Sequence, residues 1–227
     1  MITIKNLSKS YGRKEVLKGI NLHFSAGRVY GIVGENGAGK TTLFKCIAGL
    51  ETYDGLVESE LKPLKNHLGF LPTTPFFFSK ITGREYLRLL AISRQVLQVD
   101  FDQKNVFNLP LDEYAINYST GMKKKLALTA ILIQPNDFFI LDEPFNGVDI
   151  QSNILITEII HRLKAAGKTV IISSHIFSTL DHTCDEIHLL KAGQFVKKVE
   201  QHEFSDLERE LKDFTIGNTL DRLFEET

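Results

Sequence analysis

Residues 29–49 read VYGIVGENGAGKTTLFKCIAG, and this segment carries the strongest indication of fold and function in the chain. The apolar run 29–33 predicts a buried β-strand, and apolar residues at helical spacing from 43 to 48 predict a helix that ends at Gly49. Between them, residues 34–42 contain the pattern Gly-x-x-x-x-Gly-Lys-Thr, which is typical of loops that bind nucleotide phosphates. A strand, such a loop and a helix in this order predict the start of a parallel α/β sheet.

Each residue type in this loop has a physical role. Glycines let the backbone curl so that several N–H groups point at phosphate oxygens, and the positive end of the following helix adds to the attraction. The Lys40 amine can reach the β- and γ-phosphates, so Lys40 is a binding and a catalytic candidate, and the Thr41 hydroxyl can hold Mg²⁺. The predicted binding residues of the loop are Gly34, Glu35, Asn36, Gly37, Ala38, Gly39, Lys40, Thr41 and Thr42.

Length, charge and composition exclude several classes of protein. The 227 residues suffice for one domain with a sizeable core, and a net charge of -1 gives no electrostatic footprint for nucleic acid. The basic run Lys123–Lys125 is expected to be a solvated helix face. Two cysteines favour a reduced, intracellular protein without disulfides, and no apolar run approaches the ~20 residues of a membrane helix. We therefore expect no nucleic-acid partner.

Hydrophobic patterning divides the chain into a sheet-forming core and a helical insertion. Alternation at residues 2–7 predicts an edge strand of an antiparallel sheet, and residues 16–24 alternate again. A capping box at residues 82–85 predicts the start of a helix. We predict one domain over residues 1–227, with a core at about 1–77 and 135–227, a helical subdomain at about 78–134 and a helical tail from 203 to 227.

Two further predicted strands end in residues suited to phosphate chemistry. The apolar runs 138–141 and 169–172 are typical of strands buried on both faces, and in such sheets ligands gather at the carboxyl ends of the strands. Asp142 follows the first run and can hold Mg²⁺, while Glu143 can polarise or deprotonate an attacking water. His175 follows the second run and is placed to contact a γ-phosphate. We therefore predict Asp142 as a metal ligand and Glu143 and His175 as catalytic residues.

With these motifs in this order, the chain resembles the ATP-binding subunit of an ABC transporter over roughly residues 1–200. Residues 34–42 correspond to the Walker A loop of that family and residues 138–143 to its Walker B strand, and residues 146–149 resemble its D-loop. The resemblance implies that His175 is the switch histidine of the family. It also implies that Tyr11 stacks on the adenine of ATP.

The Leu-Ser-Gly-Gly-Gln signature of the family is partly present, as Tyr-Ser-Thr-Gly-Met at residues 118–122. Ser119 and Gly121 match, and a hydroxyl and a small residue at a helix N-terminus suit an anion. In this family that helix contacts the nucleotide bound to the other protomer. The resemblance therefore makes Ser119 and Gly121 candidate binding residues for the ATP of a partner chain.

The resemblance implies an α/β fold with a P-loop NTPase core and a mostly parallel sheet, an N-terminal antiparallel β subdomain and an inserted helical subdomain. It implies an ATPase that uses ATP and Mg²⁺, pairs head to tail with a second ATP-binding subunit, favouring a homodimer, and drives an integral membrane permease. The protein is then expected in the cytoplasm, peripheral on the inner face of the cell membrane through that permease. The signature and residues 80–85 lean towards export systems.

The loop after residue 71 departs from the family pattern. Thr73 stands where the family has Gln, sometimes Glu, a side chain that usually touches Mg²⁺ and the attacking water. A threonine is shorter and reaches less far, which argues against metal coordination from this loop. Next to it, Phe76, Phe77 and Phe78 cannot all face inward, so we expect some of them to dock the permease. The alternative is a local cluster packed under Pro75.

Three other functions compete with transport. A soluble ABC-type ATPase acting on nucleic acid or the ribosome usually has a coiled coil, a second cassette or a basic arm, and the sequence has none of these. A P-loop kinase or GTPase would not explain Ser119, Asp149 and His175 together, and no Asn-Lys-x-Asp element for guanine is found. Glu143 and His175 argue against a cassette that binds ATP with little turnover, while Thr73 leaves that alternative open.

Overall fold

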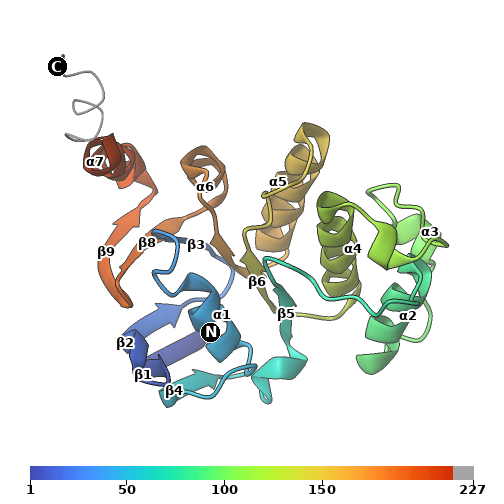
Figure 1. Ribbon diagram of the computed structural model, residues 1–227, viewed down its shortest axis with the longest axis horizontal. Coiled ribbons are helices and arrows are strands. Elements are labelled where there is room, and N and C mark those ends of the chain that lie inside the picture. Colours follow the sequence, from blue (N-terminus) through green and yellow to red (C-terminus); the bar gives the residue numbers. More distant parts are fainter. Residues whose placement is uncertain (217–227) are drawn as a thin grey trace.

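The computed structural model describes the main chain of residues 1–216 and the side chains of residues 1–213 (Figure 1). The strands are β1 (Ile2–Tyr11), β2 (Lys14–Phe24), β3 (Val29–Val33), β4 (Asp54–Ser59), β5 (Leu68–Leu71), β6 (Phe138–Asp142), β7 (Thr169–Ser173), β8 (Glu186–Lys191) and β9 (Gln194–Glu200). The helices are α1 (Lys40–Ile47), α2 (Gly83–Ser93), α3 (Phe101–Lys104), α4 (Thr120–Ile133), α5 (Ile150–Ala165), α6 (Phe177–Thr183) and α7 (Phe204–Ile216). Single 3-10 turns lie at Leu64–Asn66, Ala115–Asn117 and Gln201–Glu203.

A six-stranded sheet in the order β5-β6-β7-β3-β8-β9 forms the centre of the fold. The neighbours from β5 to β8 are parallel, and β9 returns antiparallel to β8 as a hairpin. Every residue of β6 and β7 is buried, because both faces of the sheet are covered. Alternate side chains point to opposite faces, so Phe139 and Leu141 join one hydrophobic cluster and Phe138 and Ile140 the other.

A separate three-stranded antiparallel sheet has the order β2-β1-β4. β1 is hydrogen-bonded on both sides, to β2 and to β4, so the prediction of an edge strand at residues 2–7 is wrong. The alternation of Ile2, Ile4 and Leu7 reports only that one face of the strand is buried. A central strand of a sheet with one exposed face has the same pattern.

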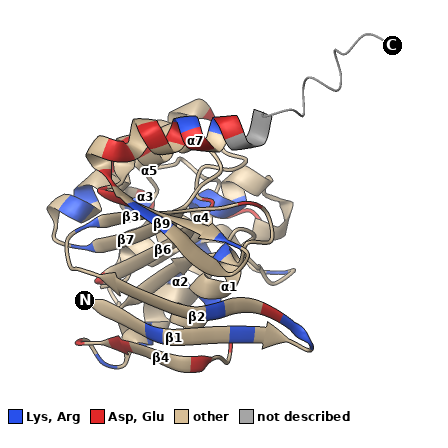
Figure 2. Ribbon diagram, turned by 90° about the vertical axis from the view of Figure 1, so that its left-hand side faces the viewer, with Lys and Arg blue, Asp and Glu red and all other residues tan. Residues whose placement is uncertain are grey.

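The two hydrophobic clusters lie on opposite faces of the six-stranded sheet. One fills the space between the two sheets and includes Leu43 and Phe44 of α1. The other is covered by the later helices, which contribute Leu128, Ile160 and Leu207. Figure 2 shows the three-stranded sheet and α7 on opposite sides of the molecule, with charged residues spaced along α7. The phosphate loop therefore leads into a helix that is held between two sheets.

The chain between β5 and β6 forms α2, α3 and α4, and Figure 1 shows α4 between the sheet and the other two helices. The predicted capping box begins α2: Glu85 N–H donates to Thr82 Oγ1 at 3.2 Å, and Thr82 N–H donates to the Glu85 carboxylate at 2.8 Å. Arg84 donates to Asp102 at 2.9 and 3.0 Å and to Asp112 at 2.7 and 3.0 Å. These charged contacts hold the segment after α2 against the start of that helix.

The predicted fold class is confirmed: the fold is α/β with a mostly parallel sheet, an N-terminal antiparallel β layer and helices inserted after β5. Cys46 and Cys184 are buried free thiols. The predicted helical tail from residue 203 begins as α7, and residues 217–227 of that prediction lie outside the described part of the chain. Within residues 1–216, no helix combines the length and the apolar character needed to cross a bilayer.

Candidate active site

The glycine-rich loop joins β3 to α1 in a conformation that glycine permits. Gly37 and Gly39 have φ values of +82° and +113°, which residues with a side chain rarely adopt. The Lys40 amine is buried at the start of α1 and donates to the carbonyl oxygens of Gly34 at 2.6 Å and Glu35 at 3.2 Å. The lysine amine is thus directed into the hollow of the loop.

Three hydroxyls converge on the carboxylate of Asp142 at the end of β6. Thr41 Oγ1 donates to Asp142 Oδ2 at 2.7 Å, and Ser173 Oγ donates to Asp142 Oδ1 at 2.6 Å. Thr73 Oγ1 donates to Asp142 Oδ2 at 2.6 Å, so this side chain does reach the candidate metal site. The Pro72–Pro75 loop lies beside the end of β6 and brings the shorter threonine side chain within hydrogen-bond range of Asp142, whereas the expectation that Thr73 does not coordinate a metal stays a prediction.

Glu143 and His175 lie in contact, as expected from the ends of β6 and β7. The main-chain N–H of His175 donates to Glu143 Oε2 at 3.2 Å, and His175 Nε2 lies 3.1 Å from Glu143 Oε1. The Glu143 side chain is buried, whereas His175 is partly exposed. A histidine with this exposure can contact the carboxylate on one side and a bound phosphate on the other.

A cleft of about 330 Å³ brings most of the predicted site residues together. Its lining residues are Lys14, Val16, Asn36, Gly37, Gly39, Lys40, Thr41, Thr42, Thr73, Asp142, Glu143 and His175. Burial lowers the pKa of Lys40, although the carboxylates of Glu143 and Asp142 oppose this shift. Two cations and two carboxylates around one polar hollow suit an anionic ligand that carries a divalent metal.

The remaining predicted loop residues, Gly34, Glu35 and Ala38, stabilise the loop next to the cleft. The carbonyls of Gly34 and Glu35 hold the Lys40 amine, and Ala38 packs in the hydrophobic cluster between the sheets. At Gly34 a Cβ would lie 2.2 Å from the carbonyl oxygen of Leu190, so only glycine fits between the loop and β8. These three residues therefore shape the loop and do not line the cleft.

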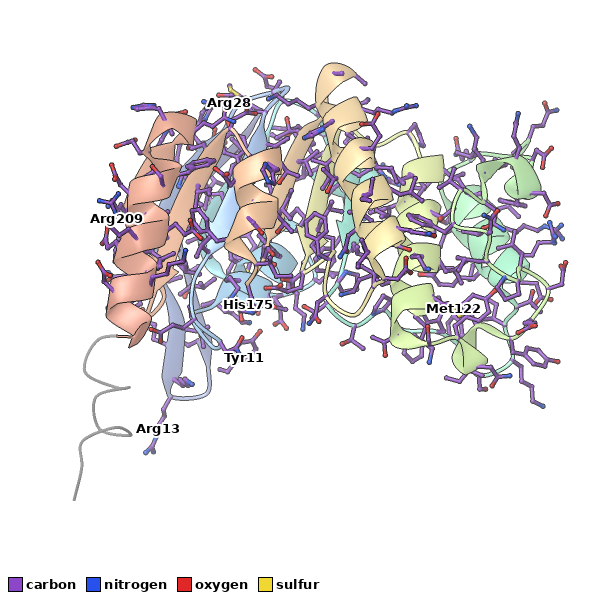
Figure 3. All side chains as sticks on the ribbon, turned by 90° about the horizontal axis from the view of Figure 1, so that it is seen from above. Tyr11, Arg13, Arg28, Met122, His175 and Arg209 are labelled. Atoms are coloured by element: carbon purple, nitrogen blue, oxygen red, sulfur yellow. The ribbon has the colours of Figure 1, made fainter. Side chains whose placement is uncertain are left out.

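Tyr11 lies at the end of β1, and 45% of its surface is exposed. The Lys9 amine lies 4.8 Å from the centre of its ring. Burial against its neighbours raises the pKa of Tyr11, and a hydrogen bond with Glu51 adds to this effect. The Tyr11 hydroxyl also has a hydrogen bond with Thr42, which lines the cleft, and Figure 3 labels Tyr11 and His175 on the same side of the molecule. The ring is thus available to a ligand at the edge of the candidate site.

Ser119 and Gly121 lie at the start of α4 and are not among the residues that line the cleft. Ser119 caps the helix, because its Oγ accepts a hydrogen bond from Met122 N–H at 3.2 Å. Figure 3 shows Met122, on the first turn of this helix, on the same side of the molecule as His175 but well separated from it. The start of α4 therefore lies apart from the cleft within one chain.

Two residues of this region were missed by sequence reasoning. Ser173 Oγ accepts a hydrogen bond from Glu143 N–H at 3.0 Å and donates to Asp142, so it orients both carboxylate residues. Lys124 is buried, and Lys125 pairs with Asp149 at 3.2 Å, so the prediction that the basic run Lys123–Lys125 is a solvated face is wrong. Ser173 is the last residue of β7, and that position could have indicated its role at the site. The burial of Lys124 depends on the tertiary packing of α4, which the sequence does not show.

The oxygen donors around Asp142 fit Mg²⁺. Mg²⁺ prefers oxygen ligands, keeps several waters and needs one or two carboxylates in addition to the phosphates of a nucleotide. Asp142 Oδ2 and Thr41 Oγ1 are 2.7 Å apart, so one small ion could contact both or reach Asp142 through water. Among the described residues, no group of three or more His, Cys, Asp or Glu side chains is arranged to hold a metal ion. A bound nucleotide would therefore have to supply some of the ligands.

Comparisons with known proteins agree with this geometry. The model of the family described as ABC transporter matches residues 17–146. The chain is 31% identical over 239 residues to the bacitracin transport ATP-binding protein BcrA of Enterococcus faecalis, covering 96% of this chain and 75% of that protein. It is 30% identical over 219 residues to the lantibiotic transport ATP-binding protein SrtF of Streptococcus pyogenes, covering 92% of this chain and 94% of that protein.

A solved structure described as the ATP-binding subunit of an ABC transporter has a TM-score of 0.82 and 26% sequence identity with this chain. The superposition covers 99% of this chain and 98% of the other. The match therefore extends across both sheets and the inserted helices. Since the family model spans more than half of the chain and its relatives match nearly all of it, this chain belongs to the ABC transporter family, as an ATP-binding subunit of the ATPase type.

Proposed function

We propose that this chain hydrolyses ATP–Mg²⁺ as a head-to-tail homodimer and drives a substrate through a separate integral membrane permease. One observation carries the proposal: the cleft holds Lys40, Asp142 and Glu143, while Ser119 and Gly121 lie outside it at the start of α4. Figure 3 shows Met122, on the first turn of α4, on the same side of the chain as His175. Two chains facing each other head to tail would bring Ser119 of each onto the nucleotide of the other. The names of both relatives, which are transport ATP-binding proteins, support the role in transport.

Within one site, the loop around Lys40 binds the β- and γ-phosphates, and Thr41 and Asp142 hold Mg²⁺, with Thr73 as a further hydroxyl. The metal ion offsets the phosphate charge when it is bound. Glu143 accepts a proton from a water whose oxygen attacks the γ-phosphorus. The bond from that phosphorus to the bridging oxygen of the β-phosphate breaks, giving ADP and phosphate. His175 holds Glu143 in place and contacts the γ-phosphate.

The shared site predicts that two inactive variants restore each other. Glu143→Gln removes the base and keeps the signature helix, whereas Ser119→Arg keeps the base and blocks the signature helix. In a mixed dimer one site then has two damaged halves and the other has two intact halves. We expect each variant alone to show little ATPase activity and the equimolar mixture to regain on the order of a quarter of wild-type turnover, limited by the fraction of mixed dimers.

Phosphate release during titration of one variant into the other measures this effect. Mixing Glu143→Gln with Lys40→Ala is the matched control, because both variants damage the same half and neither restores the other. A mixture of Glu143→Gln and Ser119→Arg with no more activity than its components would contradict the head-to-tail arrangement. The simple absence of activity in the wild-type protein would instead favour a cassette with little turnover.

We also propose that residues 78–134 form a helical subdomain on a core of residues 1–77 and 135–227, and that the permease docks where the two meet. A hollow of about 430 Å³ lies at that junction, between Phe70, Pro72 and Pro75 on one side and Tyr86 and Leu90 on the other. Docking there would place the chain in the cytoplasm, on the inner face of the membrane.

Of the three neighbouring phenylalanines at residues 76–78, one is buried and two are exposed. Phe77 is buried and packs on Tyr86 with ring centres 4.6 Å apart, which agrees with a local cluster. Phe76 and Phe78 are 74% and 58% exposed and contact each other edge to face at 5.4 Å. Large exposed aromatic side chains next to a hollow favour a protein partner.

Replacing both Phe76 and Phe78 with Ser is expected to leave ATPase activity and thermal stability of the isolated chain unchanged, because neither ring is in the core. Recruitment to membrane vesicles that contain the permease should fall at least about tenfold, since two exposed aromatic anchors are lost. Cosedimentation with the vesicles measures this. The matched control replaces Leu97 and Val106, which are also exposed but lie away from the loop, with Ser. Equal binding of both double variants would contradict the docking site.

A further inference from the structure

A buried lysine beside Glu143 has no part in the mechanism above. Lys124 lies on α4, and only 1% of its surface is exposed. Its amine donates to two main-chain carbonyl oxygens, Glu143 O at 2.6 Å and Asn146 O at 2.9 Å. Burial lowers the pKa of Lys124, although the carboxylates of Glu143 and Asp142 oppose this shift. Removing an ammonium group from water is costly, and the two hydrogen bonds to carbonyl oxygens offset part of that cost.

The main chain of Glu143 explains what the lysine does. Glu143 has a φ of +53°, a left-handed conformation that is uncommon outside glycine, asparagine and aspartate and that costs a glutamate free energy unless its neighbours fix it. Its N–H donates to Ser173 Oγ at 3.0 Å, and its carbonyl accepts the Lys124 amine. Side chains from β7 and α4 therefore hold the peptide groups on both sides of the Glu143 Cα.

The first turns of α4 are fixed to the same segment by further contacts. At Gly121 a Cβ would lie 2.5 Å from the carbonyl oxygen of Gly147, so the two backbones touch directly. Lys125 donates to Asp149 at 3.2 Å and to Ser152 at 3.1 Å. Helix α4, which Ser119 caps, is thus attached to the chain from 143 to 152 at three successive points.

We propose that Lys124 is a positioning residue that ties the main chain of Glu143 to α4, so that the Glu143 carboxylate stays beside His175 and faces the nucleotide. The proposal rests on the proposed function, because it takes Glu143 as the base. It also gives a physical path between the two sites of a dimer. The helix whose Ser119 meets the partner's nucleotide is held by Lys124 to the Glu143 that acts on the chain's own nucleotide.

Lys124→Met removes the donors and keeps an unbranched side chain of similar length. We expect kcat for ATP to fall about tenfold to hundredfold, because the base loses its fixed geometry. Affinity for ATP, measured by calorimetry on the isolated chain, should stay within about threefold of wild type, since the loop around Lys40 is untouched. Lys123→Met on the same helix is the matched control and should behave as wild type. Lys124→Gln keeps a shorter donor, so its kcat should lie between those of the wild type and of Lys124→Met. It replaces Lys124→Met in the test if that variant does not fold.

Two further readouts separate positioning from a general structural role. In a Glu143→Gln background, Lys124→Met should reduce the residual turnover little further, because no base remains to be positioned. An equal loss in both backgrounds would overturn the proposal. Amide hydrogen exchange of residues 143–147 in the nucleotide-free protein should become faster with Lys124→Met and not with Lys123→Met.

The exchange measurement does not depend on hydrolysis, so it distinguishes the two ideas. Unchanged exchange at residues 143–147 in Lys124→Met would overturn the positioning role even where the wild-type chain hydrolyses ATP. Faster exchange together with a wild-type chain that shows no ATPase activity would overturn the proposed function and leave the attachment of Glu143 to α4 standing.

Discussion

The variant Glu143→Gln is expected to turn ATP over about 10²–10⁴-fold more slowly than the wild type while ATP stays bound. An amide cannot take a proton from the attacking water, but it has the shape of the carboxylate and can keep the contact with His175, whose Nε2 lies 3.1 Å from Glu143 Oε1. The change also removes a negative charge next to the γ-phosphate. A stable complex of two chains and two ATP molecules should therefore accumulate.

Size-exclusion chromatography with light scattering tests this directly. Glu143→Gln should be a dimer in ATP–Mg²⁺ and a monomer in ADP, because in the proposed dimer the γ-phosphate would meet two helix N-termini, one at Lys40 and one at Thr120 of the partner chain. Adding Ser119→Arg should return the protein to a monomer in both. Glu113→Gln, an exposed carboxylate outside the cleft, is the control and should resemble the wild type. A monomeric Glu143→Gln protein in saturating ATP would contradict the shared site.

Lys40→Ala is expected to lower the affinity for ATP by about 100-fold or more, because hydrogen bonds from an ammonium group to phosphate are each worth about 1.5–3 kcal/mol. The amine points into the loop, where it donates to the carbonyls of Gly34 and Glu35. Calorimetric titration with ATP measures the loss, and thermal melting verifies that the loop and α1 still fold without these two bonds.

Tyr11→Ala is the comparison for that measurement. Stacking of an aromatic ring on a base contributes on the order of 1 kcal/mol, so affinity should fall about fivefold. The ring is held at the end of β1 and is half exposed, so its removal leaves no cavity in the core. Equal losses for Lys40→Ala and Tyr11→Ala would contradict the roles assigned to the two residues.

Much of the fold follows from patterns that are local in the sequence. The phosphate loop, the buried runs of β6 and β7 and the capping box at Thr82 each depend on a few consecutive residues, and the structure has all of them where they were predicted. Asp142, Glu143 and His175 could be placed in one site because parallel strands end at the same edge of a sheet. The order of the strands in the sheet determines the rest of this arrangement.

The errors lie where neighbours come from distant parts of the chain. Residues 2–7 have the same alternation at an edge and in the centre of a sheet, so nothing local reveals that β4 pairs with β1. The burial of Lys124 depends on the packing of α4 against the turn after β6, which lies about twenty residues away in sequence. The reach of Thr73 depends on the path of a loop, which side-chain length alone does not give.

The left-handed backbone at Glu143 lowers the stability of the fold, whereas the proposed catalysis requires a glutamate at this position. A residue other than glycine gives up about 1–3 kcal/mol in such a conformation, and glycine would relieve that strain. In laboratory evolution under heat alone, with no demand for turnover, glycine or asparagine should therefore enrich at position 143. The resulting proteins would be more stable and would lack ATPase activity. An ancestral sequence reconstructed from such a lineage would therefore encode a protein that binds ATP and does not hydrolyse it.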